Sequence, residues 1–234
     1  MAGLYDLIFD FENYKEIIMN IKILFVAATV AIMATGSASA STFSFSGNGG
    51  ILGSSSGFVS NDNALSLTAT ATRQDNNGNP ISGTALLGQY SGGLGVTTSR
   101  NDDHQVDSFG PEEAVLFDFG HQAVTLKSVT FSFVDRNDDF SFSFFTNDVT
   151  NPDNFFKNIS LPNSGSLQTY TFLNTWTGNL FGIGAAGAFL DSRDNFKIHS
   201  LEVAAVPLPA AAFLFAPALL GFIGLRRKAQ KTVA

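Results

Sequence analysis

The chain has 234 residues, a formal net charge of -7 and no cysteine. Its length suits one domain plus export segments, and its acidity argues against nucleic acid or an anionic lipid surface as a partner of the body. The missing cysteines exclude disulfides, thiol catalysis and thiolate metal sites, while 44% hydrophobic and only 14% charged residues exclude general disorder.

Residues 19–40 have the pattern of a secretory signal peptide. A short basic start precedes an uncharged apolar run over residues 23–34, and Ala38 and Ala40 form a small-x-small cleavage site. We expect export by the Sec translocon and cleavage by signal peptidase after Ala40.

Residues 1–18 do not fit this role. They carry four acidic residues where a signal peptide needs basic ones. We interpret them as an upstream extension wrongly assigned to the protein, whose start is then Met19.

Residues 41–203 form the body, with seven basic and sixteen acidic residues and a net charge of -9. Apolar and polar residues alternate in many short stretches that Gly, Asn and Pro separate, and this period of two is typical of strands with one buried face. We expect an all-β domain, an antiparallel, jelly-roll-like β-sandwich of about nine strands. The expected strands are 42–46, 64–72, 114–119, 123–127, 129–134, 140–144, 167–173, 180–183 and 196–203.

Phenylalanine dominates the expected core, with 24 residues in the chain. Residues 129–134 and 140–144 place Phe on one face and Ser or Thr on the other, and the polar residues between them predict an antiparallel hairpin. Phe131, Phe133 and Phe142 are therefore expected on the inner face. Trp176 has two open interpretations, a core residue or a ring that stacks on sugar.

Residues 88–110 are the longest stretch without periodicity, and long loops on sandwiches often carry function. Here and just beyond lies the densest polar cluster. Its oxygens suit Ca²⁺, with Asp102 and Asp103 as the first candidate ligands, but a solvated acidic loop stays open as the alternative. The cluster consists of Asn101, Asp102, Asp103, His104, Asp107, Glu112 and Glu113.

A second candidate site precedes the last expected strand. Asp194 and Asn195, followed by an alternating segment, resemble the closing strand of carbohydrate-binding jelly rolls. The resemblance implies a structural calcium with Asp194 as a ligand and Asn195 beside it.

No catalytic arrangement is evident. The three histidines are scattered without a zinc-binding spacing, and none of the sixteen acidic residues of the body stands out as half of a glycosidase pair. We expect a protein that is not an enzyme. A carbohydrate-binding module is the first alternative function, and a polysaccharide hydrolase is the second.

The C-terminal residues 204–225 contain no charge, and Arg226, Arg227 and Lys228 follow at once. Twenty-two residues at a rise of about 1.5 Å span roughly 33 Å, enough for one transmembrane helix. The basic residues predict a cytoplasmic tail at 229–234 and a body outside the membrane.

Val206, Pro207, Leu208 and Pro209, followed by the apolar segment and the basic triplet 226–228, resemble the PEP-CTERM sorting signal. Leu208 stands where the name-giving motif has Glu. The resemblance covers about 23 residues and implies an exosortase substrate of a Gram-negative bacterium that also makes exopolysaccharide. It implies a precursor anchored in the inner membrane, then a structural or adhesive protein of the cell surface or extracellular matrix.

Overall fold

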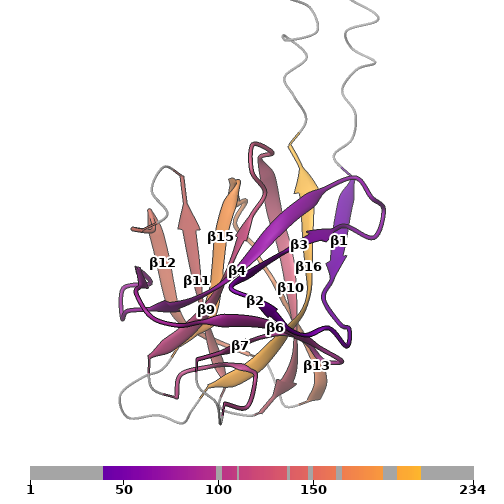
Figure 1. The fold of residues 1–234 in the computed structure, drawn as a ribbon. Coiled ribbons are helices and arrows are strands. Elements are labelled where there is room, and N and C mark those ends of the chain that lie inside the picture. Colours follow the sequence, from indigo (N-terminus) through magenta and orange to yellow (C-terminus); the bar gives the residue numbers. More distant parts are fainter. Residues whose placement is uncertain are drawn as a thin grey trace, which may run out of the picture. The chain divides into compact units, whose positions relative to one another are not determined.

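The computed structural model describes residues 39–98, 102–109, 111–135, 138–146, 150–161, 165–186 and 194–206. These residues form sixteen strands and connecting loops, with no helix among them, and the strands belong to two antiparallel sheets (Figure 1). None of the described segments is a helix that could cross a membrane. The predicted signal peptide, up to residue 38, and the predicted sorting tail, from residue 207, lie outside the described residues.

The first sheet has nine strands, with β16 in the middle. Its main path runs β13-β10-β16-β7-β6-β2, while β1 and β8 also pair with β16, and β14 pairs with β10. Its strands are β1 (Ala40–Ser44), β2 (Gly50–Gly53), β6 (Leu86–Tyr90), β7 (Gly93–Thr97), β8 (Val106–Asp107), β10 (Val124–Val134), β13 (Gly165–Thr171), β14 (Thr177–Gly178) and β16 (Asn195–Ala205).

The second sheet has seven strands in the order β12-β11-β15-β9-β4-β3, with β5 beside β4. Its strands are β3 (Ser55–Val59), β4 (Ser66–Gln74), β5 (Pro80–Ile81), β9 (Glu112–Asp118), β11 (Asp139–Phe145), β12 (Asn154–Ser160) and β15 (Leu180–Ala185). The predicted all-β antiparallel sandwich is therefore confirmed for the described residues.

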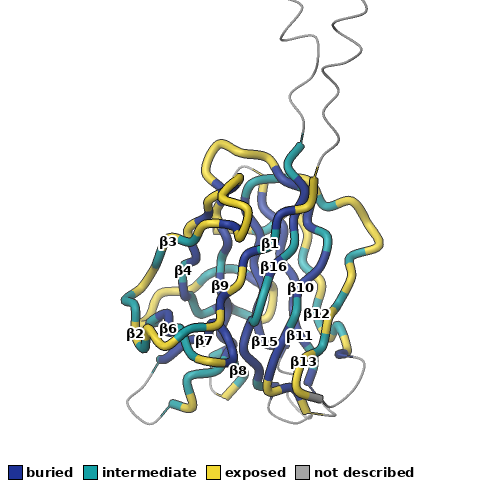
Figure 2. Tube along the Cα trace, turned by 90° about the vertical axis from the view of Figure 1, so that its right-hand side faces the viewer, coloured by how far each residue is buried: buried dark blue, intermediate teal, exposed yellow. Residues whose placement is uncertain are grey.

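The core lies between the two sheets, and phenylalanine supplies most of its largest fully buried side chains. Phe131 on β10 meets Phe140 on β11 with ring centroids 4.9 Å apart, and Phe142 is 6.3 Å from Phe181 on β15. In the tube of Figure 2, the buried residues follow the strands and the exposed ones gather in the loops. Trp176 lies at the edge of this core and packs against Phe142 at 5.7 Å.

The predicted hairpin of residues 129–134 and 140–144 is wrong. β10 pairs with β13, β14 and β16, whereas β11 pairs with β12 and β15 in the other sheet. β10 and β11, although consecutive in the chain, therefore belong to different sheets. The Phe faces of the two strands therefore meet across the core instead of lying side by side.

The burial of side chains on β10 and β11 also differs from the expectation. Phe133 has a positive φ of 59° inside β10 and turns its ring outward, where it is 57% exposed. Ser141 and Ser143, expected in water, are buried, and Ser141 Oγ accepts a hydrogen bond from Gln74 Nε2 at 2.8 Å. Strict alternation fails here because Phe133 leaves the extended conformation and because the Gln74 side chain of β4 packs on Ser141 of β11.

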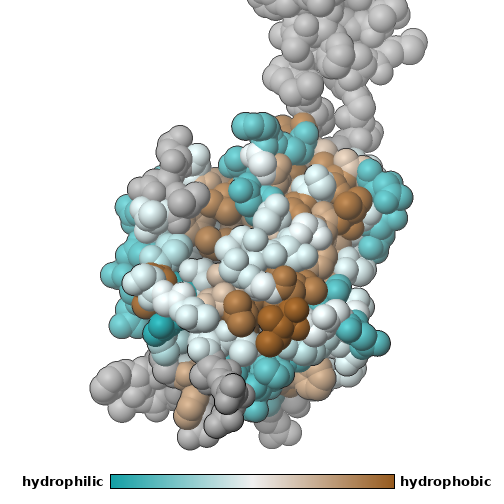
Figure 3. All heavy atoms as spheres, viewed as in Figure 1, coloured by the Kyte–Doolittle hydropathy of each residue, from teal (hydrophilic) through white to brown (hydrophobic). Residues whose placement is uncertain are grey.

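The segment 88–110 also contains more order than expected. β6 and β7 form an antiparallel hairpin in which Tyr90 pairs with Gly93. Its strands are rich in glycine, which hides the alternation from sequence analysis. Figure 3 shows apolar side chains over β2 and β6, where Ile51 of β2 is 53% exposed.

Candidate functional site

Three carboxylates from different elements meet beside the first sheet. Asp102 lies in the loop after β7, Asp107 ends β8, and Glu113 is the second residue of β9. One oxygen of each lies within 4.8 Å of the others, and this is the one acidic group of three found in the described ranges. We call it the acidic triad.

Local hydrogen bonds fix Asp102 within its loop. Its Oδ2 accepts from the Thr98 backbone N at 2.8 Å, and its Oδ1 accepts from the His104 N at 3.0 Å. The second bond is the turn that Asp forms with the residue two positions on. His104 has a positive φ of 58°, which lets the chain reverse after this turn.

The loop lies directly against the sheet, and Gly95 of β7 makes room for it. A Cβ at Gly95 would collide with the carbonyl of His104. That carbonyl accepts a hydrogen bond from Nζ of Lys197 on β16, and the His104 imidazole stacks on Tyr90 with centroids 5.3 Å apart. The position of Asp102 therefore depends on a glycine, a lysine and an aromatic ring of the sheet.

The triad is electrostatically strained. Burial, together with the nearby charges of Asp107 and Asp102, raises the pKa of Glu113 to about 8. Burial also raises the pKa of Asp107 to about 6. Glu113 is 1% exposed and its Oε2 accepts from the Asp107 N at 3.2 Å, so water cannot screen its charge.

Three carboxylates this close cannot all stay ionised in a buried place without compensation. A proton on Glu113 is one solution, and a cation is the other. Ca²⁺ holds oxygens at about 2.3–2.6 Å, so ligands on opposite sides lie roughly 5 Å apart. The spacing of the triad fits this ion, although Asp102 also uses both its oxygens as hydrogen-bond acceptors.

The triad is poorly suited to glycoside hydrolysis. Retaining and inverting enzymes need carboxyl groups about 5–10 Å apart with a sugar between them. Here the oxygens lie within 4.8 Å and Glu113 is almost fully buried. The arrangement can hold a proton or a small ion more readily than a substrate.

Asp102 was predicted as a ligand and belongs to the triad, whereas Asp103, predicted beside it, is exposed and lies outside. Asp107 and Glu113 were part of the polar cluster but were not singled out. Adjacent strand residues point to opposite faces, so Glu112 turns away from Glu113 and forms an ion pair with Lys157. The sequence alone does not tell which face of β9 each Glu occupies, so it could not show that Glu113, and not Glu112, belongs to the triad.

Asp194 and Asn195 take part in a different arrangement. The Asp194 Oδ1 accepts from the Asp139 N at 2.8 Å, and the Asn195 N donates to Oδ1 of Asp138 at 3.1 Å. Asp138 and Asp194 thus bridge the starts of β11 and β16, one from each sheet. Both are almost fully buried. The calcium role of Asp194 and Asn195 stays a prediction.

Comparison of the sequence with protein-family models found no match, and comparison with curated proteins found none either. The geometry and the sequence therefore carry the functional argument that follows.

Proposed function

We propose that the chain is an exported protein of the bacterial surface or extracellular matrix, sorted by an exosortase and associated with exopolysaccharide. Its β-sandwich, of jelly-roll-like build, acts as a structural or adhesive head and not as an enzyme. The resemblance of residues 206–228 to the PEP-CTERM signal is the observation on which this proposal rests.

The extent of the folded unit supports the proposal. Residues Ala38–Val206 form one compact unit, whose limits nearly coincide with the predicted cleavage site at Ala40 and with Val206, the first motif residue. All sixteen strands of the described residues lie between these limits. This is the arrangement expected of a domain that survives removal of the predicted signal peptide and sorting tail.

The chemistry of the acidic triad supports a calcium-stabilised form outside the cell. Ca²⁺ would be held by Asp102, Asp107 and Glu113, where it supplies positive charge to a buried acidic place. We propose this ion as a structural partner that fastens the loop after β7 to the start of β9.

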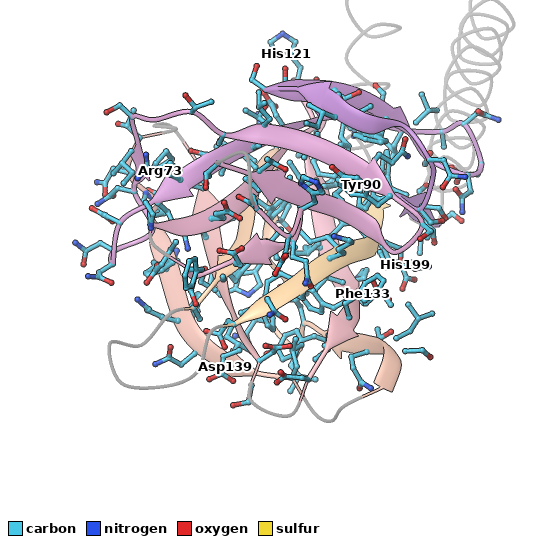
Figure 4. The ribbon with its side chains drawn as sticks, turned by 60° about the horizontal axis from the view of Figure 1, so that its bottom comes forward. Arg73, Tyr90, His121, Phe133, Asp139 and His199 are labelled. Atoms are coloured by element: carbon cyan, nitrogen blue, oxygen red, sulfur yellow. The ribbon has the colours of Figure 1, made fainter. Side chains whose placement is uncertain are left out.

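The test is the fate of the protein in cells with and without a working exosortase. An epitope tag inserted after His121, in the exposed turn between β9 and β10, follows the body without touching either end (Figure 4). We expect tagged protein at the surface or in the medium of normal cells, and in the inner membrane of cells that lack a working exosortase. Identical fractions in both strains would overturn the sorting proposal.

A further inference from the structure

The outer side of the first sheet carries a hollow that none of the functions above uses. It has a volume of about 510 Å³ and is lined by Ser91, Gly92, Ser132, Phe133, Leu167 and His199, with Ser166 beside them. This volume falls within the range of about 300–1,000 Å³ that is common for ligand sites. The lining combines one phenyl ring, one imidazole, one aliphatic side chain and several hydroxyl groups.

Phe133 is held in this hollow by an unusual backbone. Its φ of 59° lies in the left-handed region, which bulky residues rarely adopt. The result is a ring that is 57% exposed on a strand whose preceding aromatic residue, Phe131, is fully buried. Backbone strain of this kind persists only where the surrounding structure enforces it, and it clusters at active sites and ligand clamps. A relaxed backbone would place the Phe133 ring elsewhere.

Gly92 and Lys197 contact the ring of Phe133. Gly92 lies under it, and a Cβ there would collide with the ring. Nζ of Lys197 lies 5.7 Å from the ring centroid, within the range of a cation–π attraction. The ring is therefore fixed from below by a glycine and by a buried cation.

His199 presents a hydrogen-bond acceptor to the same place. Its Nδ1 lies 3.1 Å from the Gly92 carbonyl, which also accepts from Ser132 Oγ at 2.6 Å. Because a carbonyl only accepts, Nδ1 carries a hydrogen, and the tautomer with its single hydrogen there has Nε2 as an acceptor. Figure 4 shows Phe133 and His199 at the same side of the sandwich.

We propose that this hollow binds one unit of a neutral polysaccharide. The C–H face of a pyranose would lie on the ring of Phe133, whose negative face attracts the weakly positive C–H groups. Its hydroxyls would donate to His199 Nε2 and exchange hydrogen bonds with Ser91 and Ser166. The inference rests on the proposed function and names the chemical class of its partner.

The charge of the domain decides between neutral and acidic glycans. Residues 41–203 carry seven basic and sixteen acidic side chains, and Lys197, whose Nζ lies 5.7 Å from the ring centroid, is buried. A polyuronate would be repelled by this surface. A neutral polymer meets no such penalty.

The experiment measures binding of the full chain, purified in detergent, to defined probes by isothermal titration calorimetry. The probes are cellohexaose, mannohexaose and chitohexaose, with hexaguluronate as the acidic comparison. The decisive variant is Phe133→Gly, because glycine accepts the positive φ without strain and so removes the ring without harming the fold. Phe109→Ala is the matched control, since that ring is 68% exposed and lies outside the hollow.

We expect at least one neutral probe to bind and hexaguluronate not to bind. Phe133→Gly should weaken binding by about tenfold or more, as loss of a stacked ring does. Its melting temperature should stay within about 3 °C of the unchanged protein, since relief of strain offsets the lost ring contacts. His199→Ala should also weaken binding, and Phe109→Ala should leave it unchanged.

Failure to bind any neutral probe, or binding that survives Phe133→Gly, overturns the inference. Self-association of the chain that Phe133→Gly abolishes, without glycan binding, also overturns it and makes the hollow a contact between copies. A protein that is sorted to the surface but binds no glycan contradicts only this inference. A protein that binds glycan but is not sorted contradicts only the proposed function.

Discussion

Ala40, the first residue of β1, lies directly opposite Ala204, near the end of β16. The two ends of the described domain therefore lie side by side at one end of the sandwich (Figure 1). β16 also pairs with β10, β7 and β8, so the first sheet cannot be completed before residues 195–205 are available. In a chain that is exported from its N-terminus, the domain closes only when the segment next to the sorting motif has crossed.

The first prediction concerns calcium. If the triad binds Ca²⁺, the melting temperature of the metal-free protein rises with added CaCl₂, because an ion that binds only the folded state stabilises it by about 2.7 kcal/mol at a hundredfold excess over Kd. Asp107→Asn should remove most of this rise. Asp103→Asn, an exposed acid of the same loop outside the triad, should keep it. A rise that is equal in both variants contradicts the site.

The second prediction concerns pH in the absence of calcium. Glu113 and Asp107 have raised pKa values of about 8 and about 6, so the folded state binds protons that the unfolded state has released. The free energy of unfolding should therefore fall as the pH rises toward 8, by about 1.4 kcal/mol per pH unit for each such proton. Urea denaturation with EDTA at pH 5, 6.5 and 8 measures it.

Above pH 8, Lys197 reverses the slope of the free energy of unfolding against pH. Burial lowers its pKa to about 8, so the unfolded state binds the extra proton between this value and the usual 10.5. Stability should rise again over this interval, which places the minimum near pH 8. Glu113→Gln should flatten the fall below pH 8 and leave the rise above it. A profile that Glu113→Gln does not change contradicts the electrostatic account of the triad.

The third prediction concerns the core. Phe131 and Phe142 are fully buried between the sheets, so Phe131→Ala or Phe142→Ala should lower the free energy of unfolding by about 3–5 kcal/mol. Phe109→Ala removes an exposed ring and should change it by less than about 1 kcal/mol. Chemical denaturation of the three variants decides the matter. Equal small losses would mean that the Phe faces do not form the core.

The alternation of residues allowed prediction of the two-sheet sandwich and of the buried ring at Phe142. It did not reveal which strands pair, because β10 and β11 have the same pattern whether they lie side by side or face each other across the core. It also missed Phe133, since a single positive φ inside a strand leaves no trace in a period of two. The glycines of β6 and β7 have no side chains with which to show a pattern at all.

The candidate site was predicted as a cluster but not as a set of ligands. Asp102 and Asp107 were near each other in sequence, but their meeting with Glu113 depends on the pairing of β8 with β16. Glu112 and Glu113 were indistinguishable because the face of β9 was unknown. The bridging roles of Asp138 and Asp194 depend on contacts between sheets, which sequence spacing does not encode.

The fourth prediction tests how the loop of the triad is held. Gly95→Ala should push the His104 carbonyl away from β7, break its bond to Lys197 and displace Asp102. The variant should lose both stability and the calcium-dependent rise in melting temperature. Gly57→Ala is the control, because a Cβ at Gly57 of β3 meets its nearest atom only at 4.0 Å. An unchanged calcium response in Gly95→Ala would show that the loop is not fixed through this contact.

The most direct test of the central claim, export and sorting by the two ends, is the intact mass of the mature protein from its own cells, with the outer surface and the medium included. The account predicts a product that begins at Ser41 and lacks Arg226, Arg227 and Lys228, because both the signal peptide and the C-terminal sorting segment have been removed. A product that begins at Ser41 but keeps these three residues would contradict exosortase processing and leave an ordinary membrane-anchored domain. A product that still contains residues 19–40 would contradict export itself.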